Sequence, residues 1–117
     1  MKKDTEMFEN RDFANLPFNE TGIRGYIYIS TKEGQHGARI KYLEKLGKEN
    51  PSVSISISKI PKILVKSNEL TIDDKTKEKI FEWVKKNKGK LMMFWKNGAY
   101  MARSKVEQLL DSLEPVE

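Results

Sequence analysis

The chain contains no cysteine and a single histidine, His36, among its 117 residues. The lack of cysteine excludes disulfide bonds, thiolate catalysis and cysteine-ligated metal sites. One histidine excludes a two-histidine metal site within one chain. No apolar run approaches the roughly 18 residues of a membrane span, and residues 1–6 lack the apolar segment of a signal peptide. These absences lead us to expect a cytoplasmic protein that uses neither a metal ion nor another cofactor.

The composition is that of one small basic domain. Hydrophobic residues make up 38% and charged residues 33%, and the net charge is +5. The charge is uneven, because residues 23–98 carry a net +9 while residues 1–22 and 99–117 each carry −2. A basic body attracts polyanions. The same lysines also keep a small protein in solution, so charge alone leaves both interpretations open.

The N-terminal segment shows no periodicity. Residues 1–22 scatter apolar side chains among acids and amides, with Pro17 and Gly22 as breakers. We therefore expect an irregular arm, followed by a single α+β domain over residues 23–117. The phenylalanines of the arm suggest that it docks on a partner rather than staying free. They are Phe8, Phe13 and Phe18.

Four segments have the composition of β-strands. The clearest, residues 52–58, alternates serine with valine or isoleucine, which predicts one buried and one hydroxyl-bearing face. Pro61 lies close to the last segment and places it at an edge or end of the sheet. We predict a three- or four-stranded, mainly antiparallel sheet. The strands are expected at about 24–31, 38–43, 52–58 and 62–66.

Two helices are expected after the strands. An apolar stripe at three- and four-residue steps predicts a long helix over about 73–96, packed on one face of the sheet. Thr71 is the expected N-cap, and Gly89 is expected to kink or break the helix. A second, short helix is expected at about 105–113. The stripe consists of Ile80, Trp83, Val84, Asn87, Leu91, Phe94 and Trp95.

The sequence offers little for catalysis. His36 lies in a polar, glycine-containing turn that lacks the Gly-Lys-Ser/Thr ending of a phosphate-binding loop. No nucleophile-elbow motif accompanies it. We expect an exposed, inert histidine, assign no catalytic residue and favour a non-enzymatic protein.

A basic and aromatic group on neighbouring strands is more informative. Tyr26 and Tyr28 lie on one predicted strand, and Arg39 and Lys41 on the next. If the register brings them to one face, stacking surfaces lie beside cations, as in proteins that bind single-stranded nucleic acid. The alternative is a tyrosine packed in the core and solvated lysines, and sequence does not reveal the register.

Two methionines adjoin the helical stripe. Met92 and Met93 lie at its edge, where they either complete the core or form an exposed partner site together with the phenylalanines of the arm.

Several of these segments, over about residues 24–96, resemble small bacterial proteins of the domain of unknown function 4160 family. The resembling segments are 26–29, 38–42, 53–57 and 80–95. The resemblance implies a compact α+β domain without established enzymatic activity, and a protein partner in toxin–antitoxin-like gene pairs. The family usually carries two alternating histidines on the second strand, and here Ala38 and Ile40, or Arg39 and Lys41, stand in their place.

Three functions are compatible with these observations. The leading hypothesis is a small non-enzymatic interaction module with a protein partner, in a toxin–antitoxin-like or defence-related system. The alternative is a nucleic-acid-binding protein that uses the basic and aromatic sheet face. The third is a histidine-poor ribonuclease toxin acting through Tyr100, Arg103 and lysines.

Overall fold

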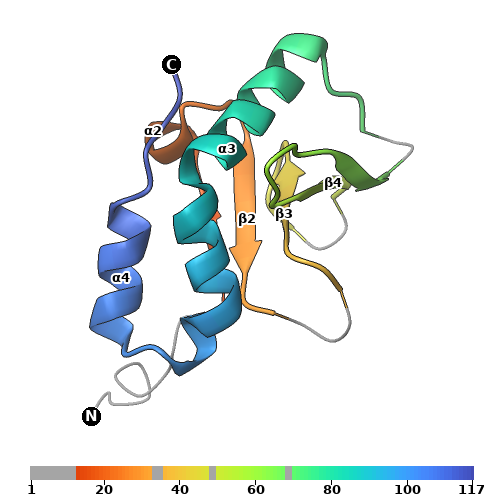
Figure 1. The fold of residues 1–117 in the computed structure, drawn as a ribbon. Coiled ribbons are helices and arrows are strands. Elements are labelled where there is room, and N and C mark those ends of the chain that lie inside the picture. Colours follow the sequence, from red (N-terminus) through yellow and green to blue (C-terminus); the bar gives the residue numbers. More distant parts are fainter. Residues whose placement is uncertain (1–12, 33–35, 48–49, 68–69) are drawn as a thin grey trace.

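A computed structural model describes residues 13–32, 36–47, 50–67 and 70–117. The fold is α+β, with a long helix lying across a sheet and a shorter helix beside it (Figure 1). In chain order the elements are β1 (Phe13–Leu16), α2 (Phe18–Thr21), β2 (Tyr26–Ser30), β3 (Arg39–Leu43), β4 (Ser52–Ser56), β5 (Ile63–Lys66), α3 (Asp74–Asn97), the 3₁₀ turn η1 (Gly98–Tyr100) and α4 (Arg103–Asp111).

The sheet is antiparallel and five-stranded, in the order β1-β2-β3-β4-β5. The four predicted strands are present as β2 to β5, and β1 is a fifth strand that was not predicted. Residues 13–21 differ from the irregular arm expected over residues 1–22, because they form β1 and α2. A four-residue strand is too short to show a period, and it is ordered by pairing with β2. Phe8 lies outside the described residues.

The long helix confirms the predicted stripe, since all seven of its members are buried. Two details differ. The N-cap is Asp73 rather than Thr71, and its carboxylate Oδ1 accepts a 2.7 Å hydrogen bond from the Thr76 N–H. The helix also continues unbroken through Gly89, which is exposed. Backbone hydrogen bonding on both sides evidently outweighs the roughly 1 kcal/mol cost of a helical glycine.

The Asp73 cap predicts a pH dependence of folding. Its hydrogen bond from Thr76 holds the pKa of the Asp73 carboxyl below its ordinary value of 3.8. A carboxyl with a lowered folded-state pKa stabilises above its unfolded pKa, and this contribution disappears as pH falls through the folded value. Asp73→Asn keeps a capping oxygen without the charge. Wild type should therefore exceed Asp73→Asn in stability at neutral pH, and the difference should disappear as the pH falls through the lowered pKa of the folded-state carboxyl, below 3.8. Urea unfolding across pH measures this, and a difference independent of pH would contradict it.

One face of the sheet forms the core with α3 and α4. Val106 and Leu110 of α4 complete this core. Side chains alternate along each strand, so the residues between the buried ones lie on the opposite face. The buried sheet residues are Ala14, Leu16, Ile27, Ile29, Ile40, Tyr42, Val53 and Ile55, and those of α3 include Ile80, Trp83, Val84, Leu91 and Phe94.

The segment after α4 returns along α3 to α2 (Figure 1). Asn87, only 1% exposed, holds it through the backbone of Glu114. The Asn87 Nδ2 donates to the Glu114 carbonyl at 2.9 Å, and Oδ1 accepts from the Glu114 N–H at 2.8 Å. The Val116 N–H then donates to the Thr21 carbonyl at 2.8 Å. Asn87, the polar residue of the apolar stripe, thus attaches the C-terminal segment to α3 by hydrogen bonds to its backbone.

Candidate nucleic-acid interface

The strand register brings aromatic and basic side chains to one face of the sheet. Tyr28 lies directly opposite Lys41, and its neighbours Ile27 and Ile29 are buried in the core, so Tyr28 and Lys41 lie on the face away from α3. Arg39 shares that face because it lies two residues from Lys41 on the same strand. Together with Phe13 of β1, these residues form what we call the basic aromatic face.

The two rings of this face stack on each other. The centroids of Phe13 and Tyr28 are 5.8 Å apart, with an interplanar angle of 27°. The Lys41 Nζ lies 5.9 Å from the Tyr28 centroid, within the range of a cation–π contact. Phe13 is 52% exposed. An aromatic surface therefore lies directly beside a cation.

A hollow of about 490 Å³ adjoins the stacked rings. None of the described residues that line it is acidic. Arg39 lies at the other end of β3, where its Nε donates to the Gly37 carbonyl at 3.2 Å. The hollow has a size typical of small-molecule sites and mixes aromatic, cationic and amide groups. Its lining is Phe13, Asn15, Tyr28, Lys41, Leu43, Leu46, Gly47, Asn50 and Ser52.

Tyr26 lies on the same face as Tyr28, two residues away on the same strand, but at the start of β2. It pairs with Leu43 and borders a second hollow, of about 470 Å³, with Phe18 and Glu44. The structure therefore places all four of the proposed nucleic-acid residues on one face of the sheet, with Tyr26 at its margin, where Glu44 lines the same hollow. Sequence reasoning missed Phe13 as part of this face, because it assigned Phe13 to an arm rather than to a paired strand.

The serine side chains of β4 are less exposed to solvent than the alternation of serine with apolar residues suggested. Ser54 and Ser56 are buried, 6% and 9% exposed. The Ser56 Oγ accepts from the Lys62 N–H at 3.0 Å and shares a 2.8 Å hydrogen bond with Ser58 Oγ. The turn before β5 thus engages Ser56 in a local network.

The residues expected to form a partner site lie on different elements. Phe18 starts α2 and is 62% exposed, whereas Phe13 belongs to the basic aromatic face. Met92 packs half-buried against the core, and Met93 is 48% exposed on α3, on the other side of the sheet from Phe13. The structure therefore does not bring these residues together in one patch.

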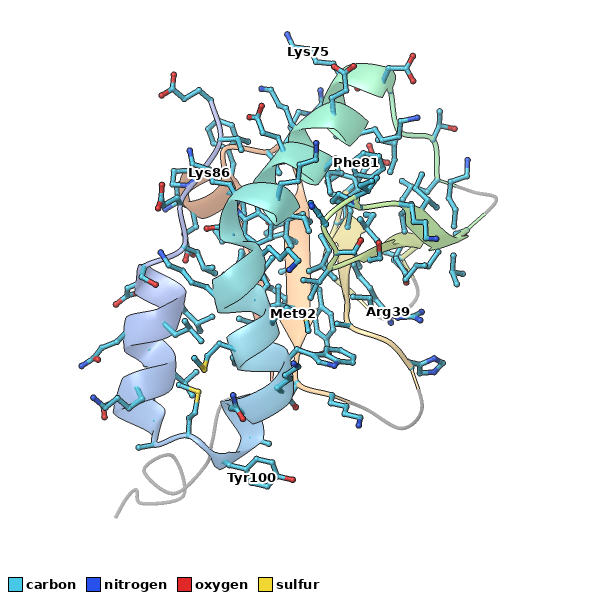
Figure 2. All side chains as sticks on the ribbon, in the orientation of Figure 1. Arg39, Lys75, Phe81, Lys86, Met92 and Tyr100 are labelled. Atoms are coloured by element: carbon cyan, nitrogen blue, oxygen red, sulfur yellow. The ribbon has the colours of Figure 1, made fainter. Side chains whose placement is uncertain are left out.

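Catalytic machinery is not evident in the described residues. They contain no group of three or more histidine, cysteine, aspartate or glutamate side chains suited to a metal ion. His36 is exposed. The Tyr42 hydroxyl donates to the Arg24 carbonyl at 2.7 Å, and burial raises the pKa of Tyr42 above its ordinary value. Tyr100 is 88% exposed, so it lacks the enclosing groups that activate a catalytic side chain. Figure 2 shows it beyond the end of α3.

The positive charge of residues 23–98 is distributed over both sides of the sheet. Eight of its lysines lie on α3, against three acidic residues of that helix. Lys75 extends outward from the start of α3 in Figure 2, whereas the Lys86 Nζ donates to the Pro115 carbonyl at 3.1 Å. The long-range field therefore belongs to the whole molecule, whereas the pairing of cations with rings is particular to the basic aromatic face.

Comparison with known proteins adds no relative. The chain matches no family model, curated protein or solved structure, so the resemblance to the domain of unknown function 4160 family stays a prediction. Within the described residues, no helix is both long and apolar enough to cross a membrane.

Proposed function

We propose that this protein is a small non-enzymatic binding module whose basic aromatic face binds single-stranded nucleic acid. The observation that carries the proposal is the register that sets Tyr28 opposite Lys41, with Phe13 stacked on Tyr28 at 5.8 Å. Unpaired bases stack on aromatic side chains, and nearby cations neutralise their phosphates.

The geometry favours single strands over duplexes. Phe13 projects from the sheet and stays 52% exposed while it stacks on Tyr28, so the pair presents aromatic surface to bases that are already unstacked. In a duplex the bases are paired and stacked on one another, so their faces are not accessible to aromatic side chains. Proteins recognise them mostly by their edges, through helices or β-ribbons placed in the grooves. The net +9 of residues 23–98 supplies attraction for any polyanion, and the stacked rings would add the preference for single strands.

The other functions expected from the sequence differ in their support. For the expected protein partner we propose a different binding surface, the edge strand β5, whose apolar side chains are exposed. A place in a toxin–antitoxin-like or defence-related system stays a prediction. No observation on the described residues favours the ribonuclease alternative, since Tyr100 stands in solvent.

Binding of a fluorescein-labelled 12-nucleotide oligopyrimidine, measured by anisotropy at 50 to 300 mM salt, tests the proposed function. Affinity should fall steeply with salt. Lys41→Glu should weaken binding at least tenfold at 50 mM salt and reduce the salt dependence. Tyr28→Ser should weaken it about 5- to 100-fold, the loss of one stacked base, whereas Tyr28→Phe should retain binding. The ribose and deoxyribose oligomers decide between RNA and DNA.

Two matched variants control for charge and for aromatic content. Lys88→Glu reverses an exposed lysine on α3, and Tyr100→Ser removes an exposed tyrosine outside the face. Both should bind within about threefold of wild type. Absence of binding to either oligomer at 50 mM salt, or equal losses in the face variants and these controls, would overturn the proposed function.

A further inference from the structure

The terminal strand β5 exposes an unusual amount of apolar side chain. Val65 is 59% exposed, and Ile63 and Leu64 are each 38% exposed. Ile60, in the turn before the strand, is 78% exposed. An exposed apolar strand at a sheet edge is a surface on which another strand can pair.

The backbone of this edge is positioned to pair. In the sheet formed by the described residues, β5 is the last strand and has β4 on one side. The Ser67 N–H donates to the Ser52 carbonyl at 3.1 Å, toward β4. The backbone N–H and C=O of one residue in a strand point to the same side, and those of the next residue point to the other side. The backbone groups of Lys66, the residue before Ser67, therefore point away from β4, toward the outer edge. An added strand would find both a donor and an acceptor there.

The charge around this edge has one sign. Lys59, Lys62 and Lys66 are exposed, and residues 57–67 contain no acidic residue. A second copy of the chain would bring the same lysines against each other, and like charges at close range oppose pairing. Proteins use edge lysines to prevent such self-association. The same lysines attract a strand that carries carboxylates.

We propose that the outer edge of β5 binds an extended acidic segment of a partner protein, which pairs as a sixth strand. Main-chain hydrogen bonds would supply register, and Lys62 and Lys66 would select carboxylates. A register shift in β5 sets Ile63 opposite Ile55 and Val65 opposite Ser54, on different faces of the sheet, so Val65 would be the side chain that packs against apolar residues on the outer face of the added strand. This edge lies at the opposite end of the sheet from β1 and its Phe13. The proposal therefore does not depend on nucleic-acid binding.

The probe is a capped seven-residue peptide of alternating glutamate and valine, compared with its lysine–valine counterpart. Titration into ¹⁵N-labelled full-length protein should shift the amide signals of residues 63–66 in a saturable way. The acidic peptide should bind at least tenfold more tightly than the basic one. The double variant Lys62→Glu/Lys66→Glu should reverse this preference.

The control variant Lys85→Glu/Lys88→Glu makes the same change of net charge on exposed positions of α3. It should keep the wild-type preference and the same shifted amides. The proposal is overturned if neither peptide binds, if shifts centre on the basic aromatic face, or if both double variants change the preference equally. Dimerisation of the wild-type protein through β5, detected by sedimentation with shifts at residues 63–66, would also overturn it in favour of a second copy.

Discussion

Replacing Asn87 with leucine is expected to lower the free energy of unfolding by about 3 kcal/mol. Leucine has the same number and branching of side-chain heavy atoms as asparagine and is not smaller, so the loss does not come from a cavity. It leaves the Glu114 N–H and carbonyl, which Asn87 engages at 2.8 and 2.9 Å, without their partner. The bond that Asn87 Nδ2 donates to the Trp83 carbonyl at 3.0 Å is lost as well, and each of the three lost hydrogen bonds costs about 0.5–1.5 kcal/mol. Urea denaturation of both proteins measures the change.

Asn97→Leu is the matched control, because it makes the same substitution at an exposed position of the same helix. Its effect should stay within about 0.5 kcal/mol. Asn87→Asp adds a second test. An ionised carboxylate can accept from the Glu114 N–H but has no hydrogen to donate to the Glu114 or Trp83 carbonyls. Its deficit relative to wild type should shrink as the pH is lowered and the carboxyl gains a proton. Equal stability of Asn87→Leu and Asn97→Leu would contradict the role assigned to Asn87.

Replacing Gly22 with alanine is expected to destabilise the protein by a similar amount, about 3 kcal/mol. Gly22 has a φ of +80°, where an L-residue is strained by roughly 1–2 kcal/mol. A Cβ there would also collide with the backbone oxygen of Val116. The C-terminal segment would have to move away, exposing the Val116 side chain and breaking the hydrogen bond from its N–H to Thr21. Urea unfolding provides the measurement.

Gly89→Ala is the control for this change, since a Cβ at Gly89 meets nothing within 4 Å and the residue lies inside α3. There alanine should raise stability by about 0.5–1 kcal/mol. The same substitution is thus expected to have opposite signs at the two positions. Because Gly22→Ala and Asn87→Leu release the same segment, their combined effect should be smaller than the sum of the separate effects. Additive losses, or a neutral Gly22→Ala, would contradict this account.

The helices and four of the strands were predictable because their signals are local. The stripe from Ile80 to Trp95 follows the helical period, and residues 52–58 alternate with the period of a strand. β1 was missed because four residues carry too little periodicity, and its order depends on pairing with β2. The strand count therefore rose from three or four to five.

The residues of the candidate site were partly predictable. Tyr28, Arg39 and Lys41 were proposed from residue type, but their common face depended on the register. A shift of one residue between β2 and β3 would set Tyr28 against a core residue. Phe13 joined them through β1, and Tyr26 lies at the margin of the same face, where it lines a hollow with Glu44.

By itself, the sequence determined which segments become helices and strands and which faces of them are apolar, because these follow from the spacing of side chains along one element. It also excluded cysteine chemistry outright. Pro61 also placed the last strand at an edge or end of the sheet, as β5 is. Only the tertiary structure decided that Tyr28 lies opposite Lys41 and that Asn87 holds Glu114. These contacts join residues 13 and 27 positions apart. They depend on the register and packing of whole elements, which no local pattern specifies.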